Sequence, residues 1–292
     1  MSLNYDEPTR RPPVSCPAYR GRLAPSPTGR LHLGHARTFW TAYRRAEAAG
    51  GTLVLRNDDL DRDRSRPEFV AGFLEDLRWL GIRWQEGPDS GGAFGPYSQS
   101  ERGPYYAAIQ TRLEELGVLY PCTCSRKDIA QALRAPHAAD DEPIYPGHCR
   151  SAQRPDGNQR YAWRFRVPDG ETVHFHDGRL GPQSLVAGRD FGDFVVRRPD
   201  GLPSYQLACV ADDAAMGITE VVRGADLLVS TARQILLYQA LGWSPPAFYH
   251  CQLVTDEHGI RLAKRASSAS LEHFRQQGVS PKELIARWEV SP

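Results

Sequence analysis

Residues 22–35 read Arg-Leu-Ala-Pro-Ser-Pro-Thr-Gly-Arg-Leu-His-Leu-Gly-His and join a short apolar strand to a helix. Two prolines stiffen the connecting loop, and Gly29 and Gly34 allow its backbone to approach a ligand closely. A helix that begins near His32 directs unpaired N–H groups and the positive end of its dipole towards the loop, where phosphate binds well. His32 and His35 can also donate to phosphate oxygens. The segment therefore predicts a phosphate site, with a rigid turn that carries two surface histidines as the alternative.

Strand-like and helix-like segments alternate around this loop, which predicts an α/β protein with βαβ units and a parallel sheet. Apolar residues recur at helical spacing in some segments and form short continuous runs in others. The expected helices cover 33–48, 66–80, 106–116 and a segment from Tyr205, and the expected strands cover 22–24, 52–56, 218–223 and 248–254. A further helix is expected from about Thr231, with Thr231 and Gln234 placed as a capping box.

The alternation breaks between residues 120 and 200, where short alternating runs predict an inserted, mostly antiparallel subdomain. The chain is expected to divide into a flexible leader, a first α/β half, this insertion, a second α/β half, and a C-terminal loop with two short helices. The corresponding ranges are 1–18, 19–119, 120–200, 201–254 and 255–292.

The composition excludes several classes of protein. The 292 residues include 36 basic and 35 acidic side chains, so the net charge of +1 gives no strong polyelectrolyte character. No apolar run reaches the roughly 18 residues that a membrane helix needs, and the N-terminus lacks an apolar signal core. A cytoplasmic protein with reduced thiols is expected. Only three of the 36 basic residues are lysines, Lys127, Lys264 and Lys282, which suggests positions where a compact ammonium is needed.

Three of the six cysteines cluster in the expected insertion. Cys122 and Cys124 are separated by one residue, and Cys149 ends the stretch Tyr145-Pro-Gly-His-Cys. Structural zinc normally takes four ligands in a tetrahedron, and His148 is the first candidate for the fourth on chemical grounds. The alternative is a set of free, buried cysteines.

Residues 22–35 resemble the ATP-binding signature of class I aminoacyl-tRNA synthetases, and the preceding Arg-x-Ala-Pro-Ser-Pro-Thr-Gly is similar to the glutamyl branch of that family. Residues 261–265, Arg-Leu-Ala-Lys-Arg, resemble the family's Lys-Met-Ser-Lys-Ser loop, with Lys264 in the place of the second lysine. Arg261 replaces the first lysine and Ala263 the first serine. Because activation moves negative charge onto pyrophosphate, an ammonium at Lys264 would meet that charge as it develops.

The resemblance implies a role for each matching position. The implied ATP-binding residues are His32, Gly34, His35, Arg261 and Lys264, of which His32, His35 and Lys264 are also implied in catalysis. The implied glutamate-binding residues are Arg22, Ala24, Ser26, Asp58, Tyr205 and Arg223. Two arginines suit a substrate with two carboxylates, and an acidic group is needed to accept its ammonium. Asp58 is one methylene shorter than the family's usual glutamate.

Three of the implied glutamate-binding residues also have interpretations that involve no ligand. Asp58 could belong to a solvated or helix-capping acidic cluster, Arg223 could form a surface ion pair, and Tyr205 could be an ordinary core residue. For the cysteine cluster, the resemblance implies the zinc ligands Cys122, Cys124, Tyr145 and Cys149.

The implied fold is the Rossmann-type catalytic domain of a class I synthetase with a zinc-binding insertion, a short helical C-terminal segment and no anticodon-binding domain. Because the chain stops soon after Lys264, it resembles the truncated members of the glutamyl branch, whose acceptor is the queuosine of tRNA(Asp). The implied partners are L-glutamate, ATP with Mg²⁺ and tRNA(Asp) bearing queuosine, bound by a monomer. Arginines of the insertion are expected to hold RNA: Arg164, Arg166, Arg197 and Arg198. The rival functions are glutamate activation with another acceptor, and RNA binding by a catalytically weak zinc protein.

Overall fold

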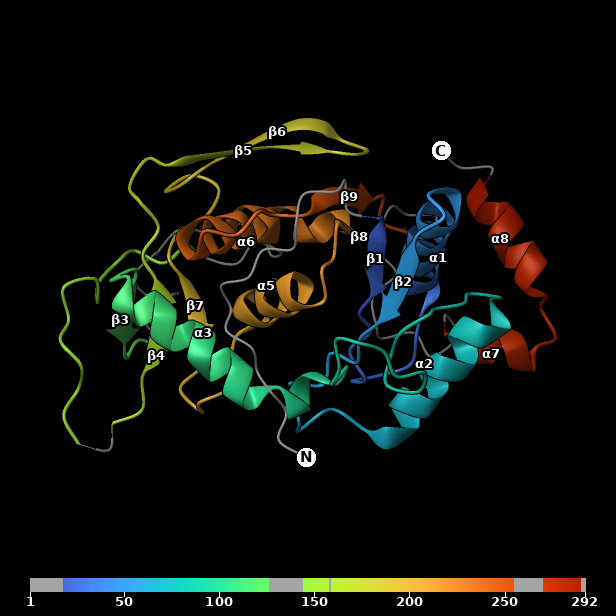
Figure 1. The fold of residues 1–292 in the computed structure, drawn as a ribbon, viewed down its shortest axis with the longest axis horizontal. Helices are drawn as coiled ribbons and strands as arrows, with labels where there is room; N and C mark the ends of the chain where they lie inside the picture. The colour runs from blue at the N-terminus through green and yellow to red at the C-terminus, as the bar shows by residue number, and fades with distance from the viewer. Residues whose placement is uncertain (1–17, 126–143, 158, 255–269, 290–292) are drawn as a thin grey trace.

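The computed structural model describes residues 18–125, 144–157, 159–254 and 270–289, and in these ranges helices and strands alternate as expected (Figure 1). The first half contains β1 (Arg20–Leu23), α1 (Leu33–Ala48), β2 (Thr52–Leu55), α2 (Pro67–Trp79), η1 (Gln99–Glu101) and α3 (Gly103–Glu115). The middle contains β3 (Leu119–Cys122), β4 (Ala162–Phe165), β5 (Thr172–Asp177), β6 (Gly181–Val186) and β7 (Phe194–Arg197). The remainder contains α5 (Tyr205–Ala215), β8 (Glu220–Gly224), η2 (Ala225–Leu227), α6 (Leu228–Leu241), β9 (Ala247–Cys251), α7 (Leu271–Gln276) and α8 (Pro281–Glu289).

The parallel strands β1, β2 and β8 lie side by side, and α1 packs against all three. This arrangement confirms the expected α/β class. β1 pairs in parallel with β2 from Arg20↔Thr52 to Leu23↔Leu55, and β8 pairs in parallel with β9. The start of β1 meets the start of β8, since the backbone N–H of Thr219 donates to the Arg20 carbonyl at 2.9 Å. The carboxyl ends of these strands therefore share one edge, where ligands bind in open parallel sheets.

The antiparallel strands of the middle region divide between two sheets. β3, β4 and β7 form a separate antiparallel sheet, as the alternating pattern predicts. The β5–β6 hairpin instead extends the sheet of the second half, in the order β6-β5-β9-β8, through the parallel pair Asp177↔Phe248. Figure 1 shows this hairpin reaching across α6 towards β9. One end of the hairpin thus lies beside the parallel strands.

The capping box expected near Thr231 is wrong. α6 begins at Leu228 without a side-chain cap, so Thr231 and Gln234 lie inside the helix, where both are buried. Their side chains face β8 and hold Arg223, as described below. Sequence spacing alone could not separate these two uses, because the same residue types serve as caps and as buried hydrogen-bond partners.

The C-terminal helices pack onto the first half of the chain. Leu271 of α7 and Leu284 of α8 are fully buried in the apolar cluster that includes Phe39 of α1 and Leu77 of α2. The backbone N–H of Leu271 also donates to the Leu31 carbonyl at 2.9 Å, so the start of α7 lies against the loop of residues 22–35. Within the described ranges, no helix combines the length and the apolar composition that crossing a membrane requires.

Candidate active site

The loop of residues 22–35 ends in a histidine that caps α1. The Nδ1 atom of His32 accepts from the backbone N–H of Gly34 at 3.1 Å. A Cβ atom at position 34 would lie 3.0 Å from the His32 ring, so glycine leaves room for this cap. The rings of His32 and His35 stack with their centroids 3.7 Å apart. Two imidazoles therefore lie at the N-terminus of α1, beside the positive end of the helix dipole.

A pocket of about 330 Å³ opens at this helix end. It is lined by every implied glutamate- or ATP-binding residue that the structure describes: Arg22, Ala24, Ser26, His32, Gly34, His35, Asp58, Tyr205 and Arg223. Arg261 and Lys264 lie outside the described residues. Tyr205, at the start of α5, exposes 41% of its surface, so its alternative assignment to the core is wrong. Residues from four separate segments thus meet in this active-site pocket.

Arg223, near the end of β8, has a buried guanidinium that is held on three sides. Nη2 donates to Thr231 Oγ1 at 2.6 Å and Nη1 donates to Gln234 Oε1 at 2.8 Å, both on α6. Nε donates to His250 Nε2 of β9 at 3.2 Å. Arg223 is only 4% exposed, so the alternative of a surface ion pair is wrong. These contacts use three of the five N–H groups of Arg223. Because the guanidinium is planar and rigid, they also fix the directions in which the two remaining N–H groups point.

His250 connects Arg223 to a carboxylate of the β5–β6 hairpin. Its Nδ1 lies 2.7 Å from Oδ2 of Asp177, and neither residue is exposed. Burial lowers the pKa of His250, and the nearby Arg223 charge lowers it further. A neutral ring with its proton on Nδ1 satisfies both contacts, because Nε2 then accepts from Arg223. His250 and Asp177 therefore position a pocket arginine, a role that the sequence analysis missed.

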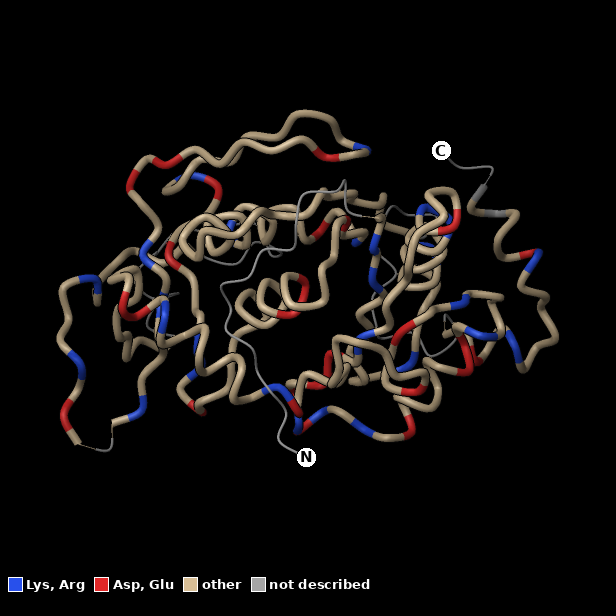
Figure 2. Tube along the Cα trace, viewed as in Figure 1, with Lys and Arg blue, Asp and Glu red and all other residues tan. Residues whose placement is uncertain are grey.

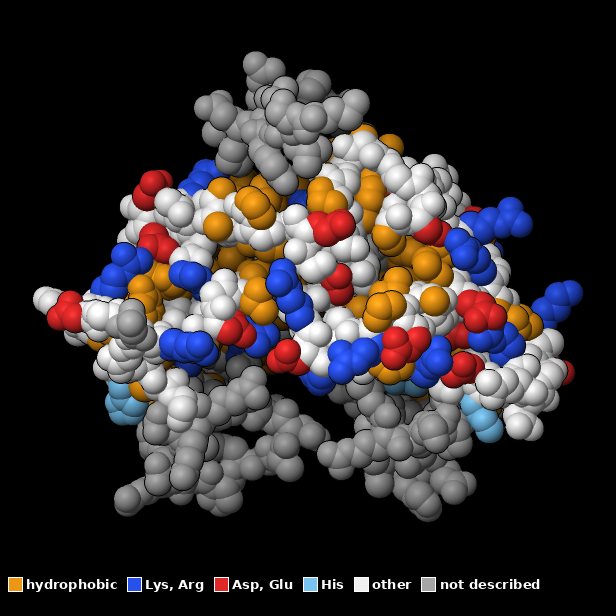
Figure 3. All heavy atoms as spheres, turned by 90° about the horizontal axis from the view of Figure 1, so that it is seen from below, with side chains coloured by type: hydrophobic (Ala, Val, Ile, Leu, Met, Phe, Trp, Pro, Cys, Tyr) orange, Lys and Arg blue, Asp and Glu red, His pale blue; other side chains and the backbone are white. Residues whose placement is uncertain are grey.

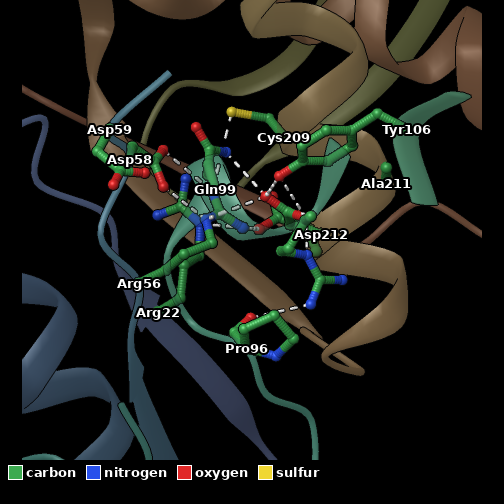
Figure 4. Close-up of polar contacts among 12 residues, drawn as sticks. Arg22, Arg56, Asp58, Asp59, Pro96, Gln99, Tyr106, Cys209, Ala211 and Asp212 are labelled. Carbon is green, nitrogen blue, oxygen red and sulfur yellow. Dashed lines mark hydrogen bonds and ion pairs between the residues drawn. The ribbon is translucent and has the colours of Figure 1, made fainter. Parts of the chain in front are cut away.

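Another buried arginine, Arg56, contacts Asp58 (Figure 4). Arg56 Nε donates to Asp58 Oδ1 at 2.6 Å, and Nη1 donates to Asp213 Oδ1 at 2.6 Å. Burial raises the pKa of Asp58, although the Arg56 charge opposes this shift. Asp58 is only 8% exposed, so the alternative of a solvated acidic cluster is wrong for this residue. Its carboxylate is thus held by a paired cation at the pocket wall.

The same cluster holds Arg22. Its Nη1 donates to the Val222 carbonyl at 2.9 Å, and its Nε lies 3.5 Å from Asp213 Oδ1. Asp212, the neighbour of Asp213 at the end of α5, accepts from Arg102 Nε at 2.6 Å and lies 3.7 Å from Arg56 Nε. Sequence analysis missed Arg56, Asp212 and Asp213; the adjacent acidic pair on a largely apolar helix was the available signal. These groups make the pocket wall a network of paired charges.

The three clustered cysteines lie together with Tyr145. The Sγ atoms of Cys122, Cys124 and Cys149 lie within 4.8 Å of one another, and Cys124 Sγ is 3.5 Å from Cys149 Sγ. The Tyr145 hydroxyl is 3.5 Å from the Sγ atoms of both Cys122 and Cys124. His148 is exposed and does not belong to this group. The cluster could hold a metal ion.

The 3.5 Å separations in this cluster are close to those between the ligands of a tetrahedral zinc ion. Thiolates about 2.3 Å from zinc lie roughly 3.8 Å apart, and an oxygen ligand at about 2.0 Å lies roughly 3.5 Å from each sulfur. Burial opposes ionisation of Cys149, but hydrogen bonds from Tyr145 and the Thr123 backbone lower the pKa of its thiol to about 7.

Arg164 faces this cluster and not the solvent. It is 7% exposed, its Nε donates to Cys122 Sγ at 3.2 Å, and its guanidinium lies 4.0 Å above the Tyr145 ring. The expectation that Arg164 holds RNA is therefore wrong: β4 directs it inwards, where a cation stabilises thiolates. For Arg166, Arg197 and Arg198 the RNA contact stays a prediction.

Comparison with known proteins gives the class to which this fold and pocket belong. Residues 18–288 match the family described as tRNA synthetases class I (E and Q), catalytic domain. The chain belongs to this family.

The individual proteins that this chain resembles belong to the glutamyl branch of the family. The Glutamyl-Q tRNA(Asp) synthetase of Nitratidesulfovibrio vulgaris is 49% identical over 266 residues, covering 89% of this chain and 82% of the relative. The Glutamyl-Q tRNA(Asp) synthetase of Symbiobacterium thermophilum is 49% identical over 272 residues, covering 91% of this chain and 84% of the relative. Among solved structures, the glutamate-tRNA synthetase of Elizabethkingia anophelis superposes with a TM-score of 0.76 at 32% identity. That match covers 85% of this chain and 53% of the synthetase, so the chain spans about half its length.

Proposed function

We propose that this protein activates L-glutamate with ATP and transfers it to the queuosine of tRNA(Asp). The observation that carries the proposal is the convergence of Arg22, Asp58, Tyr205 and Arg223 with the two stacked histidines in one pocket. The names of the two 49%-identical relatives support the choice of acceptor. Because tRNA is the substrate, we also propose a cytoplasmic protein, acting as a monomer.

Glutamate binding follows from the charges of the pocket. Arg223 uses three N–H groups within the protein and keeps two for a carboxylate. Arg22 supplies the second buried guanidinium, and Asp58 accepts the α-ammonium. Ala24, Ser26 and Tyr205 complete the pocket. Glutamine would leave one arginine without a charged partner, which disfavours it strongly in a buried site.

ATP binding follows from the helix terminus. The phosphates lie at the N-terminus of α1, where His32 and His35 donate to them and Gly34 allows close approach. By resemblance, Arg261 and Lys264 would contribute to ATP binding, with Lys264 meeting the charge that develops on pyrophosphate, and Mg²⁺ would accompany ATP. The glutamate carboxylate attacks the α-phosphorus and pyrophosphate leaves. A hydroxyl of queuosine then attacks the activated carbonyl, and AMP leaves.

Zinc is proposed as a structural ion. The sulfur atoms of Cys122, Cys124 and Cys149 and the hydroxyl of Tyr145 would hold it. The fit of the sulfur–sulfur and sulfur–oxygen distances to a tetrahedron supports this set. Arg164, which donates to Cys122 Sγ, would hold that ligand in position.

The test is glutamate-dependent ATP–pyrophosphate exchange without tRNA, with aspartate and glutamine as controls and a Lys264→Ala variant alongside. Labelled glutamate is then offered with tRNA(Asp) that contains or lacks queuosine. We expect exchange with glutamate only, its loss in the variant, and transfer only to the modified tRNA. Exchange without transfer would favour a different acceptor. RNA binding without exchange under any condition would favour the non-catalytic binding protein.

A further inference from the structure

A second cavity, of about 810 Å³, lies along α1 and is separate from the active-site pocket except that Gln252 lines both. We name it the α1 cavity. Its lining includes Trp40, Arg44, Arg45, Arg179 and Tyr249. The helix supplies its floor because residues 37, 40, 41, 44 and 48 recur at helical spacing and share one face, whereas the buried residues lie on another. No sequence motif assigns a role to this face of α1.

The lining of the α1 cavity is basic. Four arginines line it against one carboxylate, Glu220. Arg45 is neutralised by Glu220, at 2.6 and 2.7 Å. Among the residues that the structure describes, Arg44 forms an ion pair with Glu47, and both side chains are about half exposed, at 56% and 48%. Such an exposed pair is weak and exchanges readily for a phosphate. Arg179, an exposed residue in the turn of the β5–β6 hairpin, donates from Nε to the His250 carbonyl and adds a further cation. Figure 2 shows basic residues at that turn and on α1.

The same cavity offers aromatic rings beside these cations. The Arg45 guanidinium lies 4.2 Å from the centre of the Tyr249 ring, and the Arg44 guanidinium lies 6.0 Å from that of Trp40. Trp40 and Tyr249 are both half-buried, so each ring is fixed and still reachable. Cations that follow a backbone and rings on which bases stack are the combination that binds unpaired nucleotides.

The group of arginines that lines the α1 cavity is a local concentration of positive charge. On the face shown in Figure 3, acidic and basic side chains interleave, and the whole chain has a net charge of only +1. RNA binding to such a protein needs a concentrated group of cations, because phosphate contacts supply much of the affinity. The α1 cavity provides one next to the active-site pocket.

We propose that the α1 cavity binds an unpaired nucleotide and its phosphate in the tRNA substrate, next to the nucleotide that enters the active-site pocket. The inference rests on the proposed function, since it requires an RNA substrate whose reacting nucleotide is unpaired. Gln252, which lines both cavities, places the two nucleotide sites side by side.

The test uses Arg44→Gln and Trp40→Leu, with Arg78→Gln as the matched control. Arg78 is also an exposed, ion-paired arginine, 5.5 Å from the centre of a tryptophan ring, but it lies on α2 and does not line the cavity. Dissociation constants for queuosine-containing tRNA(Asp) are measured by fluorescence anisotropy over a range of salt concentrations. Glutamate-dependent ATP–pyrophosphate exchange without tRNA reports whether each variant is folded and able to activate glutamate.

We expect exchange to be unchanged in all three variants. Arg44→Gln should reduce the slope of log K against log salt by about 0.7, the value for one phosphate contact with a single strand. Trp40→Leu should weaken tRNA binding roughly 5- to 150-fold, the range for one stacked base. Binding constants and slopes equal to those of Arg78→Gln would overturn the inference, as would a wild-type protein that does not bind tRNA.

Two further results would distinguish an RNA site from a site for a free nucleotide, and the role of the α1 cavity from the proposed acceptor. The binding of GMP is measured alongside that of tRNA. If the wild-type protein binds GMP and the variants lose this binding without any change in tRNA binding, the cavity belongs to a free nucleotide and the inference is overturned. Weaker tRNA binding in the variants, together with a wild-type protein that transfers no glutamate to queuosine, would support the α1 cavity while refuting the proposed acceptor.

Discussion

Replacing Thr231 by valine tests whether the buried contacts of Arg223 support the active-site pocket. The substitution keeps the shape of the side chain and removes the hydroxyl that accepts from Arg223 Nη2 at 2.6 Å. Thr231 is fully buried and Arg223 is 4% exposed, so water cannot replace the lost acceptor. A hydrogen bond to a charged group contributes about 1.5–3 kcal/mol. We expect the free energy of unfolding to fall by that amount.

The same change should weaken glutamate binding. With one of its three anchors removed, the guanidinium loses its fixed direction, and we expect the KM for glutamate to rise roughly tenfold, as about 1.4 kcal/mol implies. The KM for ATP should not change, because the Thr231 hydroxyl contacts Arg223 and not the histidines at the N-terminus of α1, where we propose that the phosphates bind. The assays are urea unfolding and ATP–pyrophosphate exchange at varied glutamate concentrations.

Thr41→Val is the matched control for Thr231→Val. Thr41 Oγ1 donates to the Arg37 carbonyl one turn earlier in α1, at 2.9 Å, so it also makes a helical back-bond but holds no charged group. We expect its effect on stability to stay below about 0.5 kcal/mol, as for most substitutions outside such features. Equal stability changes in the two variants, with an unchanged glutamate KM in Thr231→Val, would refute the role given to the Arg223 contacts.

Three other predictions address separate parts of the molecule. Among the described residues Asp76 has no hydrogen-bond partner, and burial raises the pKa of its carboxyl to about 6. Its contribution to stability is therefore present below about pH 4 and falls by about 3 kcal/mol as the pH rises through 6. The difference in urea unfolding between wild type and Asp76→Asn should follow that course, and a difference independent of pH would contradict it. Cys122→Ser should lose the bound zinc equivalent measured by elemental analysis, whereas the buried control Cys251→Ala should keep it; equal zinc contents would exclude the proposed ligand set. Asp58→Asn should raise the KM for glutamate at least tenfold with little effect on the KM for ATP, and equal changes in both constants would show that Asp58 does not bind the amino acid.

Local sequence was sufficient for most of the helices and strands and for the residues that line the active-site pocket. α1 runs from Leu33 to Ala48 as its apolar spacing predicted, and α2 begins at Pro67, where the proline favours a helix start. The Pro/Gly loop before α1 predicted a phosphate site because restricted backbone angles and a helix terminus are local properties. The cysteine spacing predicted a metal cluster for the same reason.

Partners distant in sequence could not be predicted in this way. Arg56 is one arginine among many until the fold places Asp213 against it, and Thr231 looks like a helix cap until α6 begins three residues earlier. Asp177 lies in the region expected to form an insertion, yet its hairpin joins the sheet of β9 and its carboxylate meets His250.

The sequence by itself therefore determined the alternation of strands and helices, the loop at the start of α1, and the list of charged and polar side chains that line the active-site pocket. Only the tertiary structure decided which buried groups hold those side chains in position, and that a basic, aromatic face of α1 lines a second cavity. The physical reason is that helix and loop propensities act over a few residues, whereas a buried charge is stable only when a partner, supplied from any distance along the chain, lies within hydrogen-bonding reach.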